Sequence, residues 1–114
     1  MTEIETNGNI RHTKGDTLIL EVTPLVSSET EEPYFLKEGE YIALYVRRYP
    51  FSEPVLRITT DIQQETGVCV LTEKAENMNL KTSSYTYDVK LHSADGTEIY
   101  TFIGGTRKLL FTVV

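Results

Sequence analysis

The stretch that decides the fold is residues 84–103, SYTYDVKLHSADGTEIYTFI. Its first half alternates polar residues with apolar ones, the apolar positions being Tyr85, Tyr87, Val89 and Leu91. This period of two predicts a strand with one buried and one wet face. Asp95 and Gly96 then mark a turn, because Asp tolerates a left-handed backbone and Gly adopts positive φ without a Cβ clash. A second β-rich run at 97–103 completes a predicted hairpin, which needs a partner sheet because a lone hairpin is only marginally stable.

Other short β-rich runs supply that partner sheet. They occupy residues 10–13, 17–23, 41–49, 55–60, 68–71 and 107–113. Turn signals separate them at roughly ten-residue spacing, which is typical of an antiparallel β-sandwich and argues against parallel strands. We therefore predict an all-β fold of about eight strands, immunoglobulin-like or jelly-roll, with a small closed barrel as the alternative. The one helical signal is a short turn near 72–78, where Thr72 is the expected N-cap.

The 114 residues fit one domain by the usual size prior. Residues 1–7 lack periodicity and are predicted to be a flexible N-terminal arm, so that residues 8–114 form a single β-sandwich domain. The polar run SSETEEP at 27–33 predicts a loop, and the Gly104-Gly105 pair predicts a bend between strands. Residues 41–49 are apolar on both faces, which suits a central strand or one whose outer face meets a partner.

Composition excludes several classes of partner. The net charge of −6 disfavours nucleic acids and anionic membranes, which recruit basic surfaces. No apolar run approaches the ~20 residues of a membrane-spanning helix, and the acidic, polar start does not resemble a secretory signal. We therefore expect synthesis and retention in the cytoplasm until assembly. Cys69 is the only cysteine, so neither an internal disulfide nor a cysteine-rich zinc site can form. It lies among apolar residues, so a buried, reduced thiol is expected, with a reactive thiol as the alternative.

Motifs of catalysis and metal binding do not emerge from the sequence. His12 and His92 stand alone on polar strand positions, where surface exposure is the simplest expectation. Gly104-Gly105 lacks the lysine and helix of a phosphate-binding loop. Three carboxylates near the hairpin turn have no calcium-loop spacing. We therefore predict no catalytic residue, no metal site, no cofactor and no enzymatic activity, although a pair of carboxylates among 17 acids stays possible.

Seven tyrosines without a tryptophan are the one unusual compositional feature. Tyr41, Tyr45 and Tyr49 recur at even spacing on the predicted outer face of a strand. Such a row packs on the sheet, forms a protein interface, or stacks on sugars. These three tyrosines are the candidate interface, and an exposed aromatic platform for carbohydrate is the alternative. We expect any protein partner to bind the sheet surface or its edges.

Three long segments carry a resemblance to a known protein family. They are GNIRHTKGDTLILEV (8–22), YIALYVRRYPFSEPVLRI (41–58) and YTYDVKLHSADGTEIYTFIGGTRKLLFTV (85–113). The chain resembles small prophage-encoded proteins of Firmicutes, which are similar to the N-terminal immunoglobulin-like domain of the phage baseplate upper protein. The resemblance covers nearly the whole chain from about Gly8. Its most telling parts are KGDT at 14–17 before an alternating strand, and YDV at 87–89 leading to DGT at 95–97.

The resemblance implies an assembly role in a virion. It implies a non-enzymatic structural domain of a tail or baseplate, made in the host cytoplasm, whose partners are other phage structural proteins, with a homo-oligomer as a further possibility. No catalytic residue of that family exists to carry over to this sequence. In the baseplate upper protein the domain continues into a helical and receptor-side region, whereas residues 1–114 correspond to the domain alone.

Overall fold

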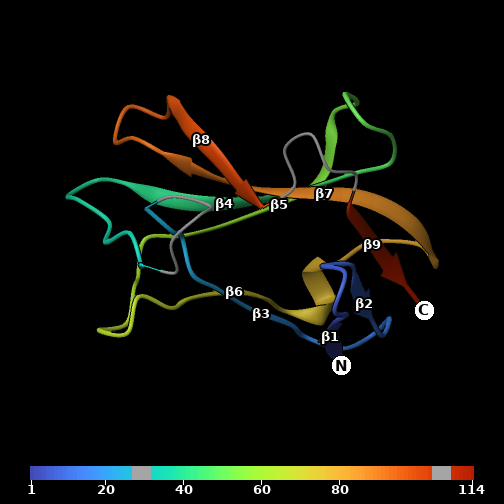
Figure 1. Cartoon of the computed structure of the whole chain (residues 1–114). Coiled ribbons are helices and arrows are strands. Elements are labelled where there is room, and N and C mark those ends of the chain that lie inside the picture. The colour runs from blue at the N-terminus through green and yellow to red at the C-terminus, as the bar shows by residue number, and fades with distance from the viewer. Residues whose placement is uncertain (27–31, 104–108) are drawn as a thin grey trace.

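The computed structural model describes residues 1–26, 32–103 and 109–114, which form two β-sheets and one short 3₁₀ turn. Figure 1 shows the two sheets as layers, with β3 and β6 lying beneath β4 and β7. The larger sheet contains β1 (Thr2–Ile4), β2 (Ile10–His12), β4 (Tyr41–Arg47), β5 (Pro54–Thr60), β7 (Ser83–His92), β8 (Glu98–Ile103) and β9 (Leu109–Val113). The smaller sheet pairs β3 (Leu18–Val22) with β6 (Cys69–Glu73). This arrangement confirms the predicted all-β, sandwich-like fold.

Strand β7 organises the larger sheet. One edge pairs antiparallel with β4, and the other edge is shared, with β9 beside the first half and β8 beside the second. The predicted hairpin is thus confirmed as β7 and β8. Its turn is closed by the Gly96 N–H, which donates to the Ser93 carbonyl at 2.9 Å, and Gly96 has the expected positive φ of 90°. Two register shifts in β7 against β8 mark irregular pairing along this hairpin.

The core lies between the two sheets. Alternate residues of β4, β7 and β9 point inward, as their period-two patterns predict. The smaller sheet buries Leu18, Leu20 and Val22, while Ile19 is 55% exposed on its outer side. Cys69 is fully buried in β6, so its predicted burial is confirmed, and desolvation raises the pKa of its thiol. A thiol in this state is a small hydrophobic residue and a poor nucleophile.

One strand pair is parallel, contrary to the prediction of a purely antiparallel sandwich. Strand β2 pairs with β9 in parallel, with Ile10 opposite Phe111 and His12 opposite Val113. Side-chain alternation reports which face of a strand is buried, but it carries no information on the direction of the neighbouring strand. The larger sheet is therefore mixed.

The N-terminal residues predicted as a flexible arm include a strand. Thr2, Glu3 and Ile4 form β1, which pairs antiparallel with β2 in the register Thr2 to His12. A three-residue strand is too short to produce a periodic pattern, so the sequence offered no signal for it. Strands β1 and β5 form the two ends of the main strand order of the larger sheet, and β8, which pairs with β7 alone among the described residues, forms a third edge.

Smaller expectations have mixed outcomes. The helical turn near 72–78 is confirmed as the 3₁₀ turn η1 (Ala75–Asn77), but its N-cap is Lys74, without a side-chain cap bond, and Thr72 belongs to β6. Residues 41–49 were expected to form either a central strand or a strand whose outer face meets a partner. The first expectation is confirmed, because β4 lies between β5 and β7. The predicted loop at 27–33 and the Gly104-Gly105 bend fall largely or wholly on residues outside the described ranges. Among the described residues, no helix combines the length and the apolar character that a membrane crossing requires.

Candidate functional site

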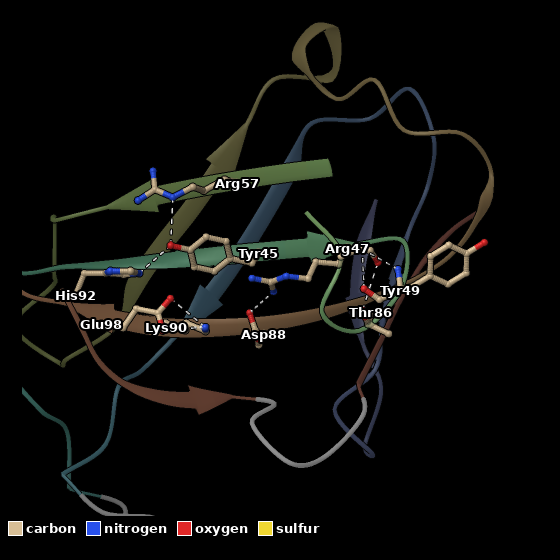
Figure 2. Close-up of polar contacts among 10 residues, drawn as sticks. Tyr45, Arg47, Tyr49, Arg57, Thr86, Asp88, Lys90, His92 and Glu98 are labelled. Atoms are coloured by element: carbon tan, nitrogen blue, oxygen red, sulfur yellow. Dashed lines mark hydrogen bonds and ion pairs between the residues drawn. The ribbon is translucent and has the colours of Figure 1, made fainter. Parts of the chain in front are cut away.

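The register of three strands brings a polar and aromatic cluster together on the outer face of the larger sheet. Tyr45 on β4 lies directly opposite Arg57 on β5 and opposite Asp88 on β7. Tyr41 lies opposite His92, and their rings stack with centroids 5.0 Å apart. We call this set the outer-face cluster; its members are Tyr41, Tyr45, Arg47, Arg57, Asp88, Lys90 and His92. Figure 2 shows the members other than Tyr41, which come from β4, β5 and β7.

A directed chain of hydrogen bonds runs through the cluster. The His92 Nδ1 atom lies 3.0 Å from the Gly96 carbonyl oxygen, which only accepts, so Nδ1 carries the proton. In the neutral ring, Nε2 is then the acceptor of the Tyr45 hydroxyl at 2.8 Å. The Tyr45 oxygen in turn accepts from Arg57 Nε at 3.3 Å. The chain thus links the guanidinium of β5 to the turn between β7 and β8.

Cations cover the ring of Tyr45, whose residue is only 8% exposed. Arg47 Cζ lies 5.0 Å from the ring centroid, and Arg57 Cζ and Lys90 Nζ each lie 5.6 Å from it. Distances below about 6 Å are favourable for cation–π attraction. The ring is therefore occupied by the protein's own side chains.

Two of these cations have carboxylate partners. Arg47 Nη1 lies 3.1 Å from Asp88 Oδ1, and Lys90 Nζ lies 3.1 Å from a carboxylate oxygen of Glu98 on β8. Figure 2 shows both pairs beside Tyr45. Because such half-exposed pairs are screened by water, each adds little to stability, but together they neutralise two of the three positive charges.

Arg57 differs from the other two cations. Among the described residues no carboxylate lies within ion-pair distance of it, and its contacts are the hydroxyls of Tyr45 and Tyr41, each at 3.3 Å. The hydrogen bond to Tyr45 raises the pKa of Arg57, so the guanidinium stays charged. Arg57 is exposed in the middle of β5, with an aromatic surface beneath it. This arrangement fixes a positive charge on the surface without neutralising it.

The third predicted tyrosine is separate from this cluster. Tyr49 lies beyond the end of β4 and is 67% exposed, with its backbone N–H bound by Ser52 Oγ at 3.2 Å. Figure 2 shows its ring on the far side of Arg47 from Tyr45. Strand β4 ends at Arg47, two residues before Tyr49, so the regular alternation that the spacing of the three tyrosines assumes does not extend to Tyr49. The structure therefore unites Tyr41 with Tyr45 and places Tyr49 in the β4–β5 connection.

Phe51 makes that connection unusual. It is fully exposed, and its φ of 70° is the one positive value among non-glycine residues that the structure describes. A left-handed backbone is costly for an aromatic residue, so the neighbouring hydrogen bonds must hold it in place. The Ser52 N–H and its hydroxyl both donate to the Tyr49 carbonyl, at 3.1 and 2.7 Å. The connection thus presents two exposed aromatic rings on a tight turn.

Both histidines are buried, which corrects the expectation of surface exposure. His12 is 1% exposed and His92 is 3% exposed. His12 Nδ1 lies 2.8 Å from Thr2 Oγ1, and Nε2 lies 3.1 Å from the Asp16 carbonyl oxygen. The position of His12 two residues after the buried Ile10 was a signal for burial, because such residues share a strand face. His92 does lie on the outer face of its strand, as predicted. Its burial comes from the stacked ring of Tyr41, which lies on the neighbouring strand, so it depends on strand pairing.

Strand β5, with seven residues, is the longest edge strand of the larger sheet; β8 has six and β1 has three. In the described part of the chain β5 pairs with β4 alone. The pairing runs from Thr60, which lies opposite Ile42, to Pro54, which lies opposite Arg47. Its sequence, PVLRITT, contains a proline only at the first position and no charge on the inner face. Val55, Arg57 and Thr59 are exposed on the outer face. About half of the backbone N–H and C=O groups of such an edge strand point away from its neighbour and stay free for pairing.

The described residues contain no group of three or more His, Cys, Asp or Glu side chains placed to hold a metal ion. Both nitrogens of His92 are engaged in hydrogen bonds, and the Cys69 thiol is buried. What the site offers chemically is a fixed cation, an open strand edge and two exposed aromatic rings. Comparison of the chain with protein-family models, with curated proteins and with solved structures found no match.

Proposed function

We propose that the protein is a non-enzymatic binding domain that receives an extended segment of a partner protein at strand β5. The observation that carries this proposal is the long, weakly protected edge of β5. Protein edges are usually blunted by lysines, prolines, bulges or covering loops, because unpaired backbone groups recruit other strands. Strand β5 has seven residues, four of which, Val55, Ile58, Thr59 and Thr60, have high β propensity. Its proline and its bulge both lie at its start, between Pro54 and Leu56, and the rest of the strand has neither device. Strand addition would satisfy its free backbone groups.

The β4–β5 connection supports the same location. Tyr49 and Phe51 project from the turn that leads directly into β5. Exposed aromatic side chains are favoured anchors in protein interfaces, since they bury a large area at a low entropy cost. A partner strand that pairs along β5 and extends past Pro54 would approach this turn.

The resemblance to the baseplate upper protein makes structural proteins of a phage the first partners to test. In this proposal the chain is a tail or baseplate component that acts by protein–protein binding, and the virion is its final location. A second copy of the chain is the other partner to test. Nucleic acids and anionic membranes are not proposed, given the net charge of −6.

Carbohydrate binding through the tyrosines has less support. A sugar platform needs an open ring face. The Tyr45 ring is covered by three cations, and Tyr41 stacks on His92. Tyr49 keeps an exposed ring, so a glycan-array screen of the purified protein still belongs in the experiment. Binding of a sugar that protects Tyr49, with no protein partner, would favour this alternative.

Paired proline substitutions test the role of the β5 edge. Adjacent residues of a strand direct their N–H groups to opposite edges, so one of Thr59→Pro and Thr60→Pro removes a bond to β4 and the other removes a free N–H. We expect one variant to be destabilised and the other to fold normally but lose association. Association is measured by sedimentation of the protein alone and with the products of neighbouring genes.

The interpretation of the two variants is direct. Thermal unfolding identifies the variant that keeps the fold, and this variant provides the test. If it associates as tightly as the unchanged protein, the β5 edge is not the binding site. As a matched control, Thr112→Pro on β9 removes no edge N–H, because β9 lies between β2 and β7, and we expect it only to destabilise the sheet.

A further inference from the structure

We propose that Arg57 determines the specificity of the β5 edge by selecting a partner strand that carries a carboxylate opposite it. This inference rests on the proposed function of β5 and adds the chemical class of the partner. The occupant is an acidic, extended segment of another protein. Three features of the outer-face cluster support it, namely the fixed position of the guanidinium, its unbalanced charge and its place in the strand.

The guanidinium is held in position before any partner binds. Its Nε donates to Tyr45 and its Nη2 donates to Tyr41, each at 3.3 Å, and it lies over both rings. These contacts use two of the five N–H donors, and the others have no acceptor among the described residues. A planar fork with free donors fits a carboxylate in bidentate geometry. Because the side chain is already ordered, binding costs less conformational entropy than it would for a free arginine.

The local charge favours an acidic partner in spite of the acidic protein. The cations around Tyr45 are Arg47, Lys90 and Arg57, and the acids among them are Asp88 and Glu98, so this patch has a net charge of +1. The whole chain has a net charge of −6. An acidic segment would be repelled by most of the surface and attracted here, and such complementarity sets the register of a complex. The Arg47 and Lys90 pairs leave Arg57 as the cation that accepts the new carboxylate.

The position of Arg57 specifies where that carboxylate must lie. Arg57 is the fourth of seven residues in β5, so a strand that pairs over the length of β5 places one residue directly opposite it. Opposite residues in neighbouring strands have Cβ atoms about 5 Å apart. Because the guanidinium is held over Tyr41 and Tyr45 on β4, the carboxylate of the added strand must reach across β5 to it. Residues 54–60 contain no carboxylate, so a second copy that pairs over these residues would place arginine near arginine. A different acidic strand fits better than self-association.

Peptide selection tests this proposal. A displayed library of random 12-residue peptides is selected on the folded protein, on Arg57→Glu and on Arg57→Gln. We expect peptides bound by the unchanged protein to be enriched in Asp or Glu at one position and to bind Arg57→Glu on the order of tenfold more weakly. Selection on Arg57→Glu is expected to enrich Lys or Arg at that position. Arg11→Glu is the matched control, since it makes the same charge change at an exposed position of β2.

Hydrogen exchange of the complexes separates failure of this inference from failure of the proposed function. If peptides protect β5 amides but show no acidic preference and bind Arg57→Glu and Arg57→Gln equally well, β5 is a binding edge and Arg57 does not select its ligand. If no selected peptide protects β5, both proposals are overturned. Circular dichroism and thermal unfolding confirm that each variant is folded, and Arg57→Gln serves the same comparison if charge reversal disrupts the sheet.

Discussion

His12 is a polar residue that belongs to the core. Its two ring nitrogens face the Thr2 hydroxyl and the Asp16 carbonyl. Because the carbonyl only accepts, Nε2 carries the proton, and Nδ1 of the neutral ring accepts from Thr2. Both partners are thus satisfied by the uncharged imidazole. Burial lowers the pKa of His12 from its ordinary value, because desolvation disfavours the charged form.

A pH dependence of stability follows from this lowered pKa. The unfolded chain protonates His12 near the ordinary pKa of about 6.5, whereas the folded protein resists protonation. The unfolded state therefore binds more protons in this range, so the contribution of His12 is complete above about pH 6.5 and decreases as the pH falls toward the folded pKa. Urea unfolding at pH 7.5, 6.5 and 5.5 measures it against His12→Gln, which does not titrate. We expect the stability difference between the two proteins to shrink on acidification; a constant difference would contradict a neutral, buried His12.

Gly96 tests the backbone of the β7–β8 turn. Its φ of 90° is unfavourable for side chains with a Cβ, while the nearest atom to an added Cβ is the Tyr41 hydroxyl at 3.9 Å. Space is therefore available, and Gly96→Val is expected to cost roughly 1–2 kcal/mol through backbone strain alone. Denaturant unfolding gives the value. The neighbouring change Thr97→Val is the control, and an equal effect of both substitutions would show that strain at position 96 is not the cause.

At the scale of the elements, the Tyr45 hydroxyl joins β4, β5 and β7. Tyr45→Phe keeps the ring but removes the donor to His92 Nε2 and the acceptor of Arg57 Nε. An unsatisfied buried polar group costs about 1–3 kcal/mol, and this is the expected loss of unfolding free energy. Tyr41→Phe removes only one bond from a half-buried residue and should cost less. Unfolding midpoints in urea decide the matter, and equal costs for the two variants would exclude the directed chain through His92.

The same hydroxyl positions the guanidinium that we propose as the carboxylate receptor. In Tyr45→Phe, Arg57 keeps its charge and its bond to Tyr41 but loses the contact at Nε. The positioning of Arg57 and the stability of the sheet therefore share one side chain. Tyr45 is nearly buried and adds little to the exposed surface of the outer-face cluster, but its hydroxyl holds Arg57 in position.

At the scale of the whole molecule, strand β1 closes one edge of the larger sheet. Its pairing with β2, together with the bond between Thr2 and His12, ties the start of the chain to the core. Removal of residues 1–5 is expected to lower the unfolding free energy by about 1–2 kcal/mol, since it deletes this bond and the short ladder. Urea unfolding measures the loss, and hydrogen exchange of β2 amides should accelerate. An unchanged midpoint would show that β1 does not stabilise the fold, and it would support the flexible arm that the sequence predicts for residues 1–7.

The edge strands at the two ends of the main strand order, β1 and β5, differ in length. Strand β1 has three residues, whereas β5 has seven and a neighbouring aromatic turn. Short edge strands are a known protection against pairing. The molecule is therefore asymmetric, with the longer of these two edge strands beside the charged outer-face cluster. This asymmetry is the reason that we propose binding at β5.

The sequence by itself determined the all-β class, the β7–β8 hairpin, the positive φ of Gly96 and the burial of Cys69. Each of these depends on local chemistry: alternation along a strand, the conformational freedom of glycine, and the apolar neighbours of a thiol. Such information lies within a few consecutive residues. A sequence is sufficient for it.

Only the tertiary structure decided which strands are neighbours. It placed β2 parallel to β9, His92 beneath Tyr41, and Arg57 over Tyr45, while it left Tyr49 in a separate turn. Each contact joins strands whose pairing and register are set by the packing of the whole core, and a side-chain pattern records the buried face without naming the neighbour. The candidate site consists of such contacts. It could not be predicted from the chain, because its residues become neighbours only when the sheet is assembled.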